Sequence, residues 1–139
     1  MSSRVLRYVV LSAVALALIS CREPAWEESF LRADEVSFDG RYHFDVDFSD
    51  STALYDVSFY TKFGEGFNGK SFPVSVRWTS PSGWTLNEKV YWDADSVKVL
   101  YRKDITPPEA GVWDLSVYAE KLSGMLGMGI ITEKHDGTR

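Results

Sequence analysis

The chain has 139 residues, with 15 Lys and Arg against 20 Asp and Glu, so its formal net charge at pH 7 is −5. Proteins that bind nucleic acids carry a basic patch or stripe, whereas residues 22–139 contain no cluster of Lys and Arg. This composition argues against a nucleic-acid partner. The length suits a single domain with a core of its own.

The first 21 residues resemble a bacterial lipoprotein signal peptide. Arg4 and Arg7 form a short basic region, residues 9–18 are mainly apolar, and Leu18-Ile19-Ser20-Cys21 resembles a lipobox. A secretory signal is removed from the mature protein, which we therefore expect to begin at Cys21. The resemblance implies that the Cys21 thiol carries a diacylglycerol and that the new amino terminus is acylated. More than one acyl chain gives stable membrane anchoring, and we expect no cofactor besides this covalent lipid.

An uncleaved transmembrane anchor is the alternative interpretation of the same segment. Residues 5–20 are shorter than the roughly 20 apolar residues that span a bilayer, and they include Arg7 and Ser12. Cleavage would leave 119 residues with a net charge of −7, because residues 1–20 hold two basic side chains and no acidic one. Cys21 is the only cysteine, so the exported domain must be stable without a disulfide.

Short segments in which polar and apolar side chains alternate predict β-strands. Residues 42–49 place large apolar side chains at even positions and polar ones at odd positions, as expected of a strand with one buried face. In residues 54–63, Tyr55 and Val57 lie on the predicted inner face and Asp56 on the polar face. Similar patterns occur in residues 74–79, 84–92, 97–103, 113–119 and 126–133.

Turn sequences separate these segments. Asp39-Gly40 is a hairpin signal, and Ser80-Pro81-Ser82-Gly83 suits a type I turn. The prolines of residues 106–111 cannot donate hydrogen bonds in a central ladder. Seven or eight short strands without helical periodicity predict an all-β, antiparallel β-sandwich. The expected organisation is a signal peptide in residues 1–20, a tether in 21–29, a sandwich in 30–134 and a tail in 135–139.

Motifs for catalysis are missing from the sequence. It contains no Gly-x-Ser-x-Gly and no recognisable nucleophile with its base, so we expect a protein that is not an enzyme. His43 lies on the polar face of a predicted strand and His135 in the predicted tail, and neither has a carboxylate at the sequence spacing of a zinc site. Asp45, Asp47 and Asp50 lack the glycine and glutamate of a calcium loop. We therefore expect no metal.

Five tryptophans raise the question of a surface on which sugars stack. Trp78 and Trp113 share strand faces with aliphatic residues and belong to the predicted core. Trp84 and Trp92 flank a strand face that Glu88 interrupts. These two tryptophans are therefore the candidate glycan-stacking residues.

The loop of residues 64–71 carries one large apolar side chain, Phe67, among glycines and polar residues. Exposed aromatic side chains are favoured anchors in protein interfaces, so Phe67 with Phe63 and Phe72 forms the candidate partner-binding group. The alternative is that Phe63 and Phe72 end core strands and Phe67 plugs the end of the cleft between the sheets.

Four stretches of the chain occur in an order that is informative. They are Phe44-Asp45-Val46-Asp47-Phe48-Ser49-Asp50, Tyr55-Asp56-Val57-Ser58-Phe59-Tyr60-Thr61-Lys62, residues 74–83, and residues 111–134 with Met128-Gly129-Ile130-Ile131-Thr132-Glu133-Lys134. Together they resemble the GldH-type gliding-motility lipoproteins of bacteria with type IX secretion and their non-gliding relatives. The resemblance implies a non-enzymatic lipoprotein of the cell envelope, anchored in the outer membrane, that acts through protein contacts in a motility or secretion assembly. The rival hypothesis is a surface glycan-binding module, because a sandwich architecture alone does not decide function.

Overall fold

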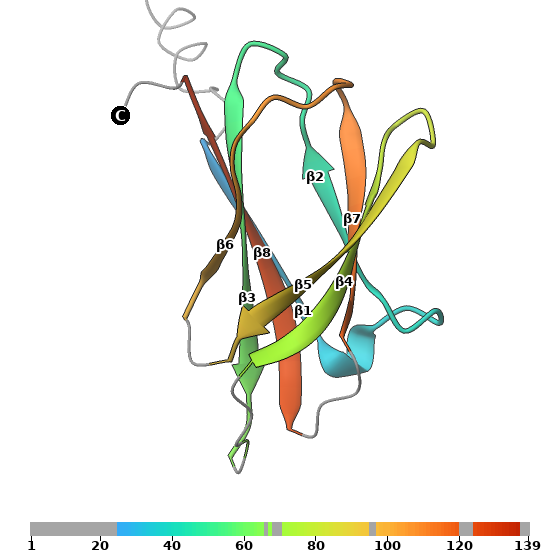
Figure 1. Cartoon of the computed structure of the whole chain (residues 1–139), viewed down its shortest axis with the longest axis vertical. Coiled ribbons are helices and arrows are strands. Elements are labelled where there is room, and N and C mark those ends of the chain that lie inside the picture. Colours follow the sequence, from blue (N-terminus) through green and yellow to red (C-terminus); the bar gives the residue numbers. More distant parts are fainter. Residues whose placement is uncertain (1–24, 66, 68–70, 95–96, 120–123, 137–139) are drawn as a thin grey trace, which may run out of the picture.

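Eight strands form two four-stranded antiparallel sheets in the computed structural model (Figure 1), which describes residues 25–65, 67, 71–94, 97–119 and 124–136. Cys21 and the rest of the expected signal peptide lie outside these ranges. Within them, no helix is long and apolar enough to cross a bilayer. In chain order the elements are β1 (Trp26–Arg32), a 3₁₀ turn η1 (Ala33–Glu35), β2 (Tyr42–Asp47), β3 (Leu54–Phe63), β4 (Ser71–Thr79), β5 (Thr85–Asp93), β6 (Val99–Ile105), β7 (Val112–Ala119) and β8 (Met125–His135).

The strand order is β1-β8-β3-β6 in one sheet and β2-β7-β4-β5 in the other. The pairs β4–β5, β3–β6, β2–β7 and β1–β8 are nested along the chain, each enclosing the one before. This order is that of a jelly roll, an eight-stranded sandwich in which a long ribbon of paired strands wraps into two sheets. The prediction of an all-β antiparallel sandwich is therefore confirmed. The free edges are β1 and β6 in one sheet and β2 and β5 in the other.

Side chains that alternate toward the interior fill the space between the sheets. The even positions of residues 42–48 are at most 5% exposed, and Trp78 and Trp113 are 8% and 2% exposed. Both tryptophans are core residues, as their strand neighbours predict. Phe48 lies at the centre of this aromatic group, with ring contacts to Tyr55, Trp78 and Trp113.

Two boundaries differ from those expected from the sequence. Trp26–Ser29, assigned to the tether, belong to β1 and pair with β8. His135, assigned to the tail, is the last residue of β8 and pairs with Leu54. Both segments join the sheet through backbone pairing, and such pairing needs no alternation of apolar side chains.

Candidate binding cleft between β5 and β6

A cleft of about 230 Å³ lies between the two sheets, beside the edge strands β5 and β6. Its walls come from both sheets, from the turn after β4 and from the loop before β7. Most of the lining side chains are apolar, and three are indole rings. The lining residues are Trp78, Trp84, Leu86, Glu88, Arg102, Ile105, Pro108 and Trp113.

The cleft is open because the N-terminal end of β5 diverges from β6, the facing edge strand of the opposite sheet. The even-numbered residues of β5 face inward, yet their exposure changes along the strand: Trp92 is 3% exposed, whereas Leu86 is 46% exposed. Figure 1 shows the β4–β5 turn standing away from β6. Inward-facing apolar side chains near this turn therefore remain accessible from solvent.

Trp84 presents a fixed aromatic surface at the mouth of the cleft. Its backbone N–H donates to Ser80 Oγ at 2.9 Å, and its carbonyl oxygen accepts from the Ser80 N–H at 2.8 Å. The Trp84 ring meets the buried Trp113 ring edge to face, with 6.2 Å between centroids. The side chain is nevertheless 53% exposed. An anchored but exposed indole is suited to contact with a ligand.

The ion pair between Glu88 and Arg102 forms the charged part of the cleft lining. Arg102 donates through Nη2 to both carboxylate oxygens of Glu88, and its Nη1 donates to the Tyr101 carbonyl at 2.8 Å. The guanidinium also lies 4.3 Å from the Tyr101 ring centroid, within the range of cation–π contacts. Glu88 therefore interrupts the apolar face of β5 because a cationic partner from β6 meets it there.

The structure separates the two candidate glycan-stacking residues. Trp84 lines the open cleft, but Trp92 stacks on Phe59 in the core, with 4.8 Å between ring centroids. Trp92 has almost no exposed surface and cannot serve as a sugar platform in this fold. Both residues point to the inner side of β5. Trp84 directly precedes β5, at the end where the sheets are apart, and Trp92 lies at the other end, where side chains of both sheets pack together.

The three candidate partner-binding phenylalanines pack against one another. Phe63 stacks on Phe67 with centroids 3.8 Å apart, and it meets Phe72 edge to face at 5.8 Å. Phe72 is 3% exposed, and Phe63 packs against the core. Phe67 is half-buried. This geometry favours the alternative in which Phe67 covers the end of the sandwich.

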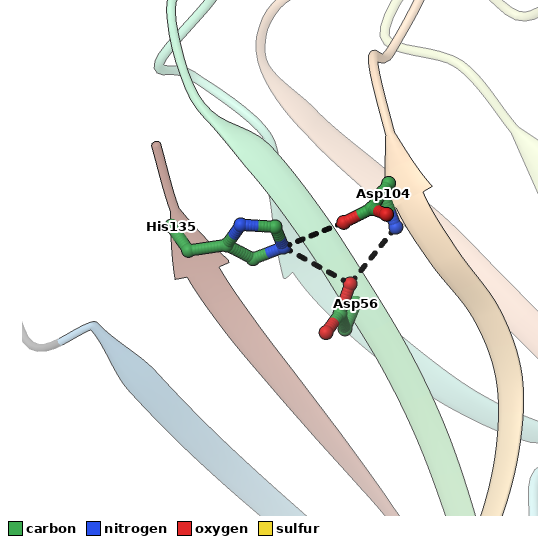
Figure 2. Close-up of side chains that lie close together, drawn as sticks. All are labelled: Asp56, Asp104 and His135. Atoms are coloured by element: carbon green, nitrogen blue, oxygen red, sulfur yellow. Dashed lines mark hydrogen bonds and ion pairs between the residues drawn. The ribbon is translucent and has the colours of Figure 1, made fainter. Parts of the chain in front are cut away.

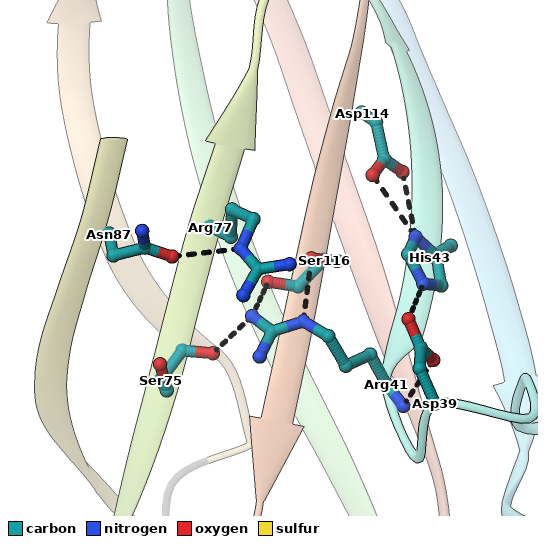
Figure 3. A network of polar contacts seen from close by, with 8 residues as sticks. All are labelled: Asp39, Arg41, His43, Ser75, Arg77, Asn87, Asp114 and Ser116. Carbon is teal, nitrogen blue, oxygen red and sulfur yellow. Dashed lines mark hydrogen bonds and ion pairs between the residues drawn. The ribbon is translucent and has the colours of Figure 1, made fainter. Parts of the chain in front are cut away.

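His43 lies in a polar network on the outer face of the sheet that contains β2 (Figure 3). Its Nε2 is 2.8 Å from Asp39 Oδ2, and its Nδ1 is 3.0 Å from Asp114 Oδ2. Burial lowers the pKa of His43, but the hydrogen bonds and charges of the two carboxylates outweigh this effect, so that its pKa is raised. Nearby, Arg41 crosses to Ser116, donating through Nε to Oγ at 2.8 Å.

The network predicts a pH-dependent contribution of His43 to stability. A raised pKa in the folded state stabilises the fold below the unfolded pKa of about 6.5, and this contribution is lost as pH rises through the folded value. We expect His43→Gln to lower the thermal midpoint at about pH 5.5 and to have little effect at about pH 8.5. Thermal unfolding of both proteins at the two pH values measures this, and an equal loss at both would contradict the assignment.

The remaining acidic candidates serve local turns. Asp47 Oδ1 accepts the Ser49 N–H at 2.9 Å, and Asp50 Oδ1 accepts the Thr52 N–H at 3.0 Å. These contacts are typical of Asx turns. A different group, Asp56 with Asp104 and His135, brings potential metal ligands together, and the sequence spacing gave no signal for it.

No protein-family model and no curated protein matches this chain.

Proposed function

We propose that this chain is a non-enzymatic, lipid-anchored protein of the bacterial cell envelope that binds a protein partner through the cleft between β5 and β6. The observation that carries the proposal is the open apolar cleft with the anchored and half-exposed ring of Trp84 at its mouth. Binding sites are typically concave and mostly apolar, with few charged groups.

The chemistry of the lining favours a protein partner. Trp and Arg are enriched among the residues that contribute most to protein interfaces, and the cleft contains Trp84 and Arg102. Glu88 and Arg102 bind each other, so the remaining lining offers mainly apolar contact. A large apolar side chain of a partner would fill such a space. It would cover Leu86 and the exposed face of Trp84.

The role in the envelope rests on the sequence. The lipobox supports anchoring through Cys21, with the outer membrane as the expected location. The resemblance to GldH-type lipoproteins supports a place in a gliding-motility or type IX secretion-associated assembly. Because the cleft is a feature of the folded domain, partner binding and membrane anchoring can be tested separately.

Anchoring predicts that Cys21→Ala abolishes incorporation of a labelled fatty acid. The variant should accumulate as precursor or as soluble protein, since the attachment atom is lost. Metabolic labelling followed by gel analysis measures this in cells that express the full chain. Labelling that persists in Cys21→Ala would overturn the assignment of the anchor.

Partner binding predicts a crosslink that depends on position. A photo-crosslinking amino acid at Leu86, inside the cleft, should capture a defined partner from intact membranes. The same amino acid at Tyr91, which is 69% exposed on the outer face of the same strand, should not. Trp84→Ala in the Leu86 background should weaken capture on the order of tenfold or more, as expected of a central interface residue. Equal capture from both positions would contradict the proposal.

A glycan is the second candidate ligand, and the specific observation in its favour is the exposed Trp84 ring beside the Glu88–Arg102 pair. Sugar rings stack on aromatic faces, while charged side chains bind their hydroxyl groups. A cleft of this size has room for about one sugar ring. Binding of the purified protein to a glycan array, lost in Trp84→Ala and kept in Tyr91→Ala, would favour this candidate over a protein partner.

A further inference from the structure

Three potential metal ligands from three strands converge at one end of the sheet that contains β3, β6 and β8 (Figure 2). Asp56 comes from β3, Asp104 from β6 and His135 from the end of β8. One ligand atom from each lies within 4.8 Å of the others. We propose that these three side chains bind a divalent transition-metal ion, with zinc as the best match to their chemistry.

A β-bulge brings Asp104 to this place. Tyr55 pairs with Ile105 and Val57 with Arg102, so one residue of β3, Asp56, lies opposite two residues of β6. Bulges of this kind redirect side chains and are common beside functional sites. The backbone N–H of Asp104 donates to Asp56 Oδ1 at 2.9 Å, which holds the Asp56 carboxylate against the backbone of Asp104.

The distances match those between ligands of one ion. His135 Nε2 lies 3.1 Å from Asp56 Oδ1 and 3.1 Å from Asp104 Oδ1. Two ligands held about 2.0 to 2.2 Å from a zinc ion in a tetrahedral or octahedral arrangement are separated by about 3 to 3.5 Å. A small outward movement of the three side chains would therefore admit the ion without rearranging the strands.

The contacts of His135 differ from those of His43, which forms ordinary ion pairs with two carboxylates. His43 meets its two carboxylates through different ring nitrogens, and each nitrogen can carry its own hydrogen. His135 meets both carboxylates through the same atom, Nε2. One ring nitrogen carries at most one hydrogen, so a single N–H faces two acceptors at equal distance. A cation at this point of convergence would lie within reach of all three ligand atoms.

Burial strengthens the case for a cation. The Asp56 side chain is 6% exposed and that of His135 is 17% exposed, and buried charged groups are found either paired with a partner or bound to a metal. The Asp104 side chain is 48% exposed, so the site borders solvent. Three protein ligands with a water molecule in the fourth position are a common arrangement for zinc.

The ligand set also predicts selectivity among ions. Imidazole nitrogen suits zinc, copper, iron and nickel, whereas calcium and magnesium prefer sites made only of oxygen. We therefore expect zinc to bind more tightly than calcium or magnesium. Because the three ligands come from three strands, the ion would stabilise the folded chain over the unfolded one.

The test uses the full-length protein in mild detergent, without an affinity tag, and with any free thiol alkylated so that Cys21 cannot bind zinc. Calorimetric titration with zinc after treatment with EDTA should give one ion per chain, and zinc should raise the thermal midpoint. Calcium at the same concentration should cause a much smaller increase. No zinc binding, or an equal response to calcium, would overturn the proposal.

Two variants and one control locate the ion. His135→Ala should weaken zinc binding on the order of tenfold or more and remove the zinc-dependent change in the thermal midpoint. Asp104→Asn should also weaken binding, and it suits the backbone because Asp104 has φ of 54°, a conformation that Asn tolerates. His43→Ala is the matched control and should bind zinc normally. Loss of binding in His43→Ala but not in His135→Ala would overturn the assignment.

Discussion

Replacing Trp113 with alanine should lower the free energy of unfolding by about 3 to 5 kcal/mol. The side chain is 2% exposed and lies where the core meets the cleft. Its ring contacts those of Phe48, Trp78 and Trp84. Its Nε1 donates to the Glu109 carbonyl at 2.8 Å. The substitution therefore creates a cavity and also removes the partner of a carbonyl in the loop before β7.

Denaturant unfolding followed by circular dichroism measures this loss without relying on tryptophan fluorescence. Trp26→Ala is the matched control, because Trp26 is 50% exposed on the edge strand β1, and it should cost less than about 1 kcal/mol. Trp78→Ala should fall in the same range as Trp113→Ala, since Trp78 is also buried and donates to Tyr101 Oη at 2.9 Å. Unfolding of Trp113→Ala within 1 kcal/mol of wild type would contradict the placement of its ring in the core.

Strand alternation predicted the core side chains of β2, β4 and β7. A period of two identifies the inner face of each strand, and Trp78 and Trp113 were placed correctly by this rule alone. Alternation does not say which strand lies beside which, because the nested pairs join segments far apart in the chain. Trp84 and Trp92 illustrate the consequence. Their shared face could be recognised, but the divergence of β5 from β6 decides that only Trp84 is accessible.

The Asp56 group could not be predicted for a related reason. Asp104 and His135 are 48 and 79 positions from Asp56, so no local spacing connects them. Alternation placed Asp56 on the outer face of β3, yet the residue is 4% exposed. On that face it contacts His135 of β8 and the backbone of Asp104 of β6. The candidate metal site therefore depends on the fold, whereas the lipobox is a purely local signal.

Two glycines of β8 lie under aromatic rings on the outer face of its sheet. Phe30 of β1 and Tyr60 of β3 lie nearly parallel, with ring centroids 5.9 Å apart and an angle of 12° between planes. A Cβ atom at Gly129 would collide with the Tyr60 ring. At Gly127 it would collide with the Phe30 ring and would also lie 2.6 Å from the Leu31 carbonyl oxygen. Both positions therefore require glycine, but the obstacles differ.

This difference predicts opposite outcomes in two double-mutant cycles. Gly127→Ala and Gly129→Ala should each destabilise the fold, by about 1 to 3 kcal/mol, through overpacking. Tyr60→Ala should relieve much of the cost at Gly129, because the obstacle there is the end of a side chain. Phe30→Ala should relieve little of the cost at Gly127, because the backbone oxygen of the neighbouring strand remains in place.

Denaturant unfolding of the single and double variants gives the coupling free energy of each pair. The pair at positions 60 and 129 should show a coupling of about 1 kcal/mol or more, with the double variant more stable than the sum of the single losses predicts. The pair at positions 30 and 127 should be nearly additive. Equal coupling in both cycles would show that the rings of Phe30 and Tyr60 alone exclude a side chain at positions 127 and 129. The close approach of the β1 backbone would then not be what excludes a side chain at Gly127.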